Sequence, residues 1–347
     1  MGTEGTTASG SEGTTASGTR TVAVFSLGGT IAMTADPATG GVVPALSAQD
    51  LLDAVPALRG LDVELRVRDF RRLPSASLGF EDLDALSEAL AEAFRNGCDG
   101  AVVTQGTDTI EETAYLLDLL HPGDQPVVVT GAMRNPTLPG ADGPANVLAA
   151  VVAAAAPELR GAGAVVVLGD EIHAARRVRK SHTTSPAAFT SPATGPLGRL
   201  YEGRVHLHGP LAPRTALAGP ATGPANAVRV GLYTATLGDD GGLLAATAQA
   251  CDGLVVAAFG VGHVPEGFVD VLERTAARIP VVLASRIGNG PVLEGTYGFP
   301  GSERDLLARG LIRGGDLDPY KARLLLRVLL TRGRGAAEIA AAFAATG

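Results

Sequence analysis

The chain is poor in cysteine, tryptophan and basic residues, and each shortage excludes a class of protein. Its two cysteines, Cys98 and Cys251, lie far apart in sequence, which argues against a disulfide framework or a zinc cluster and fits a reducing compartment. Aromatic residues make up 4 % of the chain and tryptophan is absent, so stacking platforms for single-stranded nucleic acid are not expected. Lys and Arg number 28 against 36 Asp and Glu, and this net charge of −8 disfavours binding to a nucleic-acid backbone.

Long apolar runs are also missing. The Ala/Val-rich stretch 145–156 is shorter than the roughly 18 apolar residues that a membrane-spanning helix needs, so no membrane partner is expected. The N-terminus has no basic region followed by an apolar stretch, which argues against a signal peptide. We therefore expect a cytoplasmic protein. Hydrophobic residues still make up 46 % of the chain, enough for a sizeable core.

Composition divides the 347 residues into four parts. Residues 1–19 repeat the text Glu-Gly-Thr-Thr-Ala-Ser-Gly and predict a disordered low-complexity tail. Residues 210–228 contain four prolines and few large apolar side chains, which is typical of a linker between domains. The chain is therefore expected to form an N-terminal catalytic domain at 20–209 and a C-terminal domain at 229–347.

Strand and helix patterns alternate along both parts. Strands are predicted at 21–25, 63–70, 100–104, 125–130, 164–168, 228–233, 253–258 and 281–284. Helices are predicted after a capping Ser47 and at 80–94, 109–120, 146–155, 319–331 and 336–345. This order predicts an α/β fold, with a mostly parallel sheet in a larger N-terminal α/β domain and a smaller C-terminal α/β domain.

Two predicted strands are followed by similar polar sequence motifs. Leu27-Gly28-Gly29-Thr30 follows the first, and Gln105-Gly106-Thr107-Asp108 follows the third. Glycine lets the backbone turn tightly and leaves N–H groups open to a ligand, and ligands of parallel sheets bind at the carboxyl ends of the strands. Taken singly, each threonine could equally cap a turn.

Further segments make the pattern specific. They are 131–134, 141–144, 179–184 with its Lys-x-x-Thr-Thr text, 195–198 and 318–323. With these, the chain from about Thr21 to Ala345 resembles the bacterial-type L-asparaginase family, the threonine amidohydrolases. The resemblance implies hydrolysis of the side-chain amide of L-asparagine, and less often of glutamine, without metal or cofactor. It also implies a homo-oligomer, a dimer or tetramer, whose sites lie between two chains.

The resemblance assigns roles residue by residue. Thr30 looks like the nucleophile, and Thr107, Asp108 and Lys180 look like the family's second catalytic group. Ser75 stands where the family holds the substrate's α-carboxylate. The expected substrate-binding residues are Ser75, Gly29, Ala76 and Gly106, together with Thr107 and Asp108. The chemistry suits these roles, because a threonine hydroxyl needs a base or a lowered pKa to attack, and a carboxylate such as Asp108 can pair with the substrate's α-ammonium.

The sequence departs from the family pattern at several places. Leu27 stands where threonine is usual, Gln105 where histidine is usual, and Ala76 where many members carry glutamine. The lid after Thr30 has no tyrosine, and the family's lid tyrosine falls near Gly41 or Val42. Glu294 is the nearest candidate for its acidic partner, and His263 and Pro265 replace asparagines that reach a neighbouring subunit's substrate.

Alternatives remain open at this point. The missing tyrosine motivates a catalytically weakened amino-acid-binding or regulatory homologue, and the amide-hydrolysing subunit of a tRNA-dependent amidotransferase shares the implied fold. His206 and His208 could form a metal pair, although no third ligand is evident. The basic cluster of Arg176, Arg177, Arg179 and Lys180 either is a solvated loop or holds an active-site loop or a carboxylate.

Overall fold

The structure is a computed structural model of the chain. It describes residues 18–29, 33–35, 42–44, 47–214, 216–217 and 227–345, and only the backbone of 33–35 and 42–44. Much of the predicted tail (1–19) and of the predicted linker (210–228) lies outside these residues, as does Thr30. Within the described part, no helix is both long and apolar enough to cross a bilayer.

An eight-stranded sheet forms the N-terminal domain, in the order β12-β11-β8-β7-β6-β5-β1-β4. The strands are β1 (Arg20–Ser26), β4 (Val63–Asp69), β5 (Gly100–Thr104), β6 (Val127–Thr130), β7 (Ala164–Leu168), β8 (Glu171–Ala174), β11 (Gly198–Tyr201) and β12 (Arg204–Leu207). Strands β4, β1, β5, β6 and β7 pair in parallel, and the other three extend the sheet antiparallel. The predicted mostly parallel sheet is thereby confirmed.

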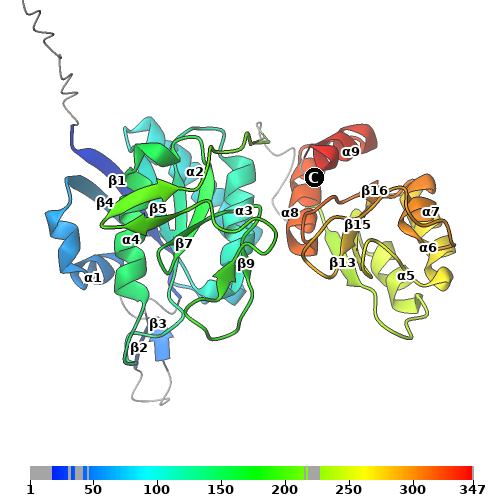
Figure 1. Cartoon of the computed structure of the whole chain (residues 1–347), viewed down its shortest axis with the longest axis horizontal. Helices are drawn as coiled ribbons and strands as arrows, with labels where there is room; N and C mark the ends of the chain where they lie inside the picture. Colours follow the sequence, from blue (N-terminus) through cyan, green and yellow to red (C-terminus); the bar gives the residue numbers. More distant parts are fainter. Residues whose placement is uncertain are drawn as a thin grey trace, which may run out of the picture.

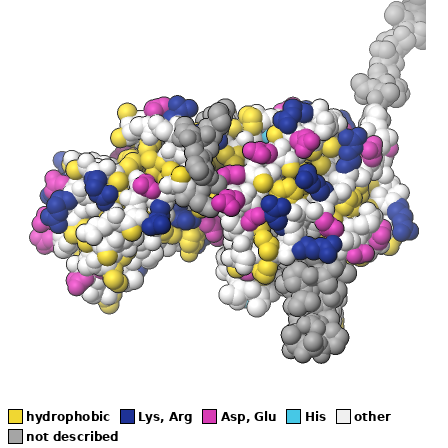
Figure 2. Space-filling model, turned by 180° about the vertical axis from the view of Figure 1, so that it is seen from behind, with side chains coloured by type: hydrophobic (Ala, Val, Ile, Leu, Met, Phe, Trp, Pro, Cys, Tyr) yellow, Lys and Arg dark blue, Asp and Glu magenta, His cyan; other side chains and the backbone are white. Residues whose placement is uncertain are grey.

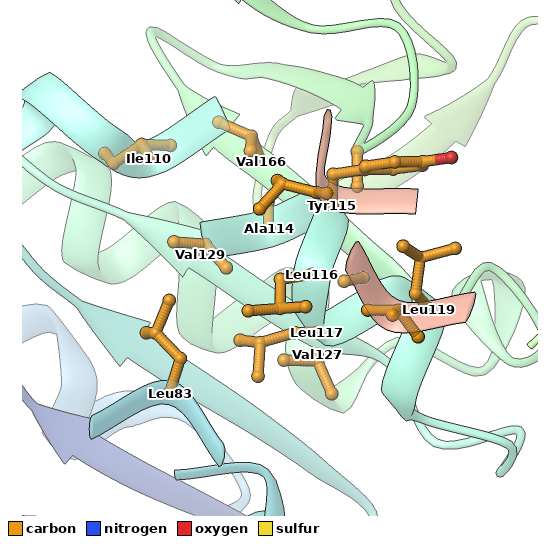
Figure 3. Close-up of a cluster of buried hydrophobic side chains, with 14 of the residues drawn as sticks. Leu83, Ile110, Ala114, Tyr115, Leu116, Leu117, Leu119, Val127, Val129 and Val166 are labelled. Atoms are coloured by element: carbon orange, nitrogen blue, oxygen red, sulfur yellow. The ribbon is translucent and has the colours of Figure 1, made fainter. Parts of the chain in front are cut away.

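Helices cover both faces of this sheet because its central strands are apolar on both sides. One face packs against α1 (Ala48–Asp53) and α4 (Gly143–Ala155), and the other against α2 (Phe80–Arg95) and α3 (Ile110–Leu120). Figure 3 shows Leu116 and Leu117 of α3 beside Val127 and Val129 of the sheet. Every residue of β5 and β7 is buried, which explains why unbroken valine runs mark these strands.

The C-terminal domain contains a smaller, all-parallel sheet in the order β13-β14-β15-β16. Its strands are β13 (Val230–Thr234), β14 (Gly253–Ala258), β15 (Val281–Ser285) and β16 (Ile312–Arg313). Helices α5 (Gly242–Gln249), α6 (Val269–Ala276) and α7 (Glu303–Ala308) cover one face. The other face packs against α8 (Pro319–Thr331), which is followed by α9 (Ala336–Ala344).

Helix α8 lies between the two sheets (Figure 1). Its leucines at 324, 325, 326 and 329 are buried, and they belong to the same apolar cluster as α3 and the large sheet. The Arg327 guanidinium lies 3.6 Å from the centre of the Phe80 ring of α2. The apolar face of α8 therefore serves the core of this chain, and burial of this face joins the two domains.

Several short elements were not predicted. Strands β2 (Met33–Ala35) and β3 (Val42–Pro44) pair as a hairpin in the predicted lid, and β9 (Arg179–Lys180) pairs with β10 (Phe189–Thr190). The antiparallel strands β8, β11 and β12 carry polar residues and are four residues long. Such short strands of mixed polarity lack the unbroken apolar runs that mark the buried parallel strands.

Single-turn 3-10 helices complete the fold. They are η2 (Pro56–Gly60), η3 (Ser75–Ser77), η4 (Thr107–Thr109), η5 (Pro157–Leu159) and η6 (Glu266–Phe268). On the face shown in Figure 2, basic and acidic side chains of the described residues are interspersed over both domains. This mixed pattern is unlike the clustered positive charge of a nucleic-acid-binding face.

Candidate active site

The two glycine-containing texts meet at the carboxyl ends of β1 and β5. These strands are parallel neighbours, with Ser26 opposite Thr104. Gly28 and Gly29 have φ angles of +97° and +89°, a region that side chains rarely adopt. A Cβ atom at Gly29 would lie 2.0 Å from the backbone nitrogen of Gly106, so the two loops touch backbone to backbone. Only glycine at position 29 permits this approach.

Thr107, Asp108 and Lys180 come together beside this junction. Lys180 Nζ donates to Thr107 Oγ1 at 2.9 Å and to Asp108 Oδ1 at 2.8 Å. Thr107 is buried and lies in η4 at the start of α3, whereas Lys180 arrives from β9, more than 70 residues later. Among the described residues, the Asp108 side chain is 66 % exposed. Because Lys180 donates to the Thr107 oxygen, the threonine's own hydrogen is free to point elsewhere.

Ser75 lies against the same turn. It is buried in η3, and its Oγ accepts a hydrogen bond from the backbone nitrogen of Asp108 at 3.3 Å. A Cβ atom at Gly106 would lie 2.6 Å from Ser75 Oγ, so the serine rests directly on this glycine. Ala76, the next residue, is exposed. The substrate-binding residues predicted at 75, 106 and 108 thus share one site, and Ala76 brings no polar side-chain atom to it.

Gln105 is buried next to the site and stabilises its turns by hydrogen bonds. The side chain is fully buried, and its Nε2 donates to the Gly106 carbonyl and to Thr109 Oγ1, both at 3.2 Å. Thr109 Oγ1 in turn donates to the Ser75 carbonyl at 3.2 Å. Among the described residues, Gln105 Oε1 has no hydrogen-bond partner. The glutamine thus ties the turn at 106–109 to the Ser75 turn.

Glu111, which the sequence analysis did not single out, contacts the same constellation. Its Oε2 accepts a hydrogen bond from the backbone nitrogen of Lys180 at 2.9 Å. Burial raises the pKa of the Glu111 carboxyl, and the nearby Lys321 opposes this rise. The available signal was weak, since an acidic residue in the first turn of a helix is ordinarily explained by the helix dipole.

The first predicted group lies mostly outside the described residues. Thr30 is not described, and neither is Gly41. For Val42 only the backbone is described, in the β2–β3 hairpin. The described neighbour of Thr30 in sequence is Gly29, which abuts Gly106.

Among the described residues, the three candidates of the C-terminal domain, Glu294, His263 and Pro265, do not contact Thr107 or Lys180 of the same chain. Glu294 lines a pocket of about 700 Å³ whose wall includes none of the predicted site residues. His263 Nε2 lies 3.2 Å from Glu303 Oε2, and its ring packs edge-on against Tyr297 and Phe299. Pro265 precedes η6. Within one chain, none of these contacts reaches Thr107 or Lys180.

The structure also bears on two weaker predictions from the sequence, the possible metal pair of His206 and His208 and the basic cluster at 176–180. The described residues contain no group of three His, Cys, Asp or Glu side chains that could hold a metal ion, and this includes the surroundings of His206 and His208. In the basic cluster, Arg177 pairs with Asp316, and Arg179 lies against the loop at Gly288. These contacts favour the interpretation that the cluster holds an active-site loop.

Comparisons with known proteins agree with this geometry. The N-terminal asparaginase domain family matches residues 21–213, and the glutaminase/asparaginase C-terminal domain family matches residues 229–343. An L-asparaginase of Bacillus licheniformis is 35 % identical over 312 residues, which cover 89 % of this chain and 95 % of that protein. A component of the glutamyl-tRNA(Gln) amidotransferase from Haloquadratum walsbyi is 33 % identical over 317 residues, which cover 88 % of this chain and 70 % of that protein.

A solved structure is also similar. The crystal structure of a probable cytoplasmic L-asparaginase from Campylobacter jejuni superposes with a TM-score of 0.84 at 32 % identity, covering 94 % of this chain and 99 % of that one. Both domain families match in order, and the relatives align over most of the chain. The chain therefore belongs to the asparaginase family of amidohydrolases.

Proposed function

We propose that the protein is an L-asparaginase, which hydrolyses the side-chain amide of L-asparagine to L-aspartate and ammonia, with minor activity on glutamine. The observation that carries this proposal is the contact of Lys180 Nζ with both Thr107 and Asp108 at the carboxyl end of a parallel sheet. Family membership and the asparaginases among the relatives support it.

The exposed polar groups suit a small amino acid. The Asp108 carboxylate is open to solvent and can pair with the α-ammonium of the substrate, while Ser75 Oγ and the backbone at Gly29 and Gly106 can hold its α-carboxylate. Ala76 provides no side-chain hydrogen bond. We therefore expect weaker retention of the α-carboxylate than a glutamine at position 76 would give.

The proposed reaction has two steps. The Thr30 hydroxyl oxygen bonds to the amide carbon of the substrate, the carbon–nitrogen bond breaks, and ammonia leaves with the proton from Thr30. Water then attacks the resulting ester, which releases aspartate and restores Thr30. In this scheme Thr107 polarises the amide and positions water, and the Lys180 ammonium stabilises negative charge that develops on oxygen. No step requires a metal or a cofactor.

Assembly and location form part of the proposal. The family resemblance favours a homo-oligomer, a dimer or tetramer whose sites are completed by a second chain. Two buried free cysteines fit a reducing compartment, and the similar structure from Campylobacter jejuni is that of a probable cytoplasmic L-asparaginase, so we propose the cytoplasm. Light scattering of a fully active monomer would refute a shared site.

The test is a steady-state measurement of ammonia release from asparagine and from glutamine, without tRNA. The proposal expects turnover of asparagine, a higher kcat/KM for asparagine than for glutamine, and a large loss in Lys180→Met. Tight binding of asparagine without turnover would favour an amino-acid-binding homologue. Ammonia release from glutamine only in the presence of glutamate-charged tRNA would favour the amidotransferase-type activity.

A further inference from the structure

The chain contains very few lysines, and both lie near the candidate active site. Only two of the 28 basic residues are lysines, Lys180 and Lys321, and the other 26 are arginines. Lysine differs from arginine in having a compact, strongly hydrated ammonium on a flexible stem, so a buried lysine requires close polar partners. The two lysines lie 141 positions apart in sequence, yet Lys321 donates a hydrogen bond to the Val178 carbonyl, two residues before Lys180.

The segment 177–180, which ends in Lys180, is anchored at each residue. Arg177 forms an ion pair with Asp316 of the C-terminal domain, in the loop before α8. Arg179 reaches the loop after β15, where a Cβ atom at Gly288 would lie 1.4 Å from its Nη1. Two of the four residues are therefore held by side chains and loops of the C-terminal domain.

The backbone on either side of Arg179 is held by two charged side chains, the buried Lys321 and the half-buried Glu111. Lys321 Nζ, in the first turn of α8, donates to the Val178 carbonyl. Glu111, in the first turn of α3, accepts from the Lys180 backbone nitrogen. Lys321 is fully buried, and the Asp318 carboxylate, 2.9 Å away, neutralises it. A buried charge that is paired and hydrogen-bonded in this way fixes the position of its partners, because leaving any of them unpaired is costly.

We propose that Lys321 and Glu111 are positioning residues for Lys180. They clamp the Val178 carbonyl and the Lys180 N–H, and thereby aim the Lys180 ammonium at Thr107 and Asp108. The C-terminal domain thus supports the Thr107–Asp108–Lys180 group of its own chain, through α8. This inference rests on the proposed function, since it takes Lys180 to be catalytic.

The kinetic test removes the Lys321 donor while keeping the length of the side chain. Lys321→Met should lower kcat by about 10- to 100-fold, the scale expected when a catalytic group is displaced by about 1 Å. KM for asparagine should change little, because Asp108 and Ser75 remain in place. The matched control is Arg327→Met, which also empties a buried basic position on α8 but faces Phe80. It should lower stability without lowering kcat.

A second pair of variants tests Glu111. It distinguishes loss of the hydrogen-bond acceptor from a change in side-chain size. Glu111→Gln keeps an oxygen that can accept the Lys180 N–H and should retain kcat within about threefold, whereas Glu111→Leu should lose at least about tenfold. If Lys321→Met fails to fold, the two Glu111 variants and Asp316→Ala, at a more exposed position, decide whether these contacts position Lys180. Asp316→Ala releases Arg177 and should lower kcat in the same direction by a smaller factor.

A spectroscopic test needs no activity. Lysine labelled with ¹³C at Cε gives two signals in this chain, and Lys180→Met and Lys321→Met assign them. In folded Lys321→Met the Lys180 signal should move, and in Arg327→Met it should stay. An unmoved Lys180 signal in folded Lys321→Met overturns the inference, as does an equal fall in kcat in both α8 variants.

The proposed function can fail separately. Wild-type protein without ammonia release from asparagine refutes that function, and the lysine signals alone then decide whether Lys321 positions Lys180. If the wild type is active and Lys180→Met is equally active, Lys180 is not catalytic and the inference falls with that result.

Discussion

At the scale of single residues, glycines and one lysine determine the candidate site. Gly29 and Gly106 permit contact between two strand-end loops, and Lys180 joins the buried Thr107 to the exposed Asp108. Neither glycine carries a functional group. Each is needed because a side chain would occupy the space of a neighbouring backbone or hydroxyl group.

Substitution of Gly29 tests this contact. Gly29→Ala places a methyl group on the Gly106 backbone and forces alanine to adopt a φ of +89°, so we expect a loss of kcat/KM above about 100-fold. Gly97→Ala is the control, because its φ is +88° but no atom lies within 4 Å of the added Cβ. That variant should lose only about 1–2 kcal/mol of unfolding free energy and keep its activity. Equal activity of the two variants would contradict the proposed contact. Urea unfolding and steady-state kinetics measure both quantities.

The order of the two threonines can be tested by trapping the acyl-enzyme. With Thr30 as nucleophile, Thr30→Ala should form no adduct with asparagine, whereas Thr107→Val should form it but hydrolyse it slowly. Rapid-quench mass spectrometry detects the adduct and locates it. The control is Thr113→Val, a fully buried threonine of α3 whose hydroxyl has no partner among the described residues. An adduct on Thr107, or one that survives in Thr30→Ala, would reverse the assignment.

At the scale of elements, short local signals set where helices begin, and the sheet sets what they pack against. Ser47 was predicted to cap a helix, and its Oγ accepts from the Asp50 backbone nitrogen at 3.1 Å. The Asp50 carboxylate reciprocates by accepting from the Ser47 nitrogen at 2.8 Å. Helix α1 then buries Leu51 and Leu52 against the large sheet.

The cap of α1 has a measurable effect on stability. Ser47→Ala should lower the free energy of unfolding by about 1 kcal/mol, because the Asp50 N–H loses its acceptor. Gln49→Ala on the same helix removes only an exposed hydrogen bond to Asp53 and should change stability by less than about 0.5 kcal/mol. Neither change should alter kcat, since the main contacts of α1 among the described residues are with β1, β4, α4 and η2. Similar stability of both variants in urea would argue against the cap.

At the scale of the whole molecule, buried charges tie segments that are distant in sequence. The Asp118 carboxylate of α3 accepts from the backbone nitrogen of Ala164 at 3.0 Å. Arg214, in the predicted linker, lies 3.6 Å from the same carboxylate and donates to the carbonyls of His121 and Gly123. Burial outweighs the attraction of the arginine and raises the pKa of Asp118 to about 6.

This raised pKa predicts how stability depends on pH. Between pH 3.8 and about 6 the folded protein holds a proton on Asp118 that the unfolded chain has released, so stability falls as pH rises through this window. The full pKa difference corresponds to about 3 kcal/mol. Asp118→Asn cannot ionise, so its stability relative to the wild type should rise by up to that amount from pH 4 to pH 6. A stability difference that is constant across this range in urea titrations would contradict the prediction.

Much of the fold follows from local sequence. The valine-rich runs at 100–104, 164–168 and 253–258 were predicted as strands at the bounds observed for β5, β7 and β14. This prediction succeeds because strands that are buried on both faces need an unbroken apolar sequence. Helix α8 was likewise predicted at its observed bounds. The antiparallel strands β8 and β11 were missed, since short segments of mixed polarity are compatible with loops as well as with strands.

The sequence by itself determined the order of strands and helices, the turn glycines and the types of residue that carry chemistry. These properties depend on near neighbours in the chain, through apolar periodicity and backbone sterics. Only the tertiary structure decided that Lys180 reaches Thr107, that Glu111 and Lys321 hold its backbone, and that α8 fills the space between two sheets. Such contacts join residues separated by tens to more than a hundred positions. They depend on how sheets and helices pack, which no local pattern encodes.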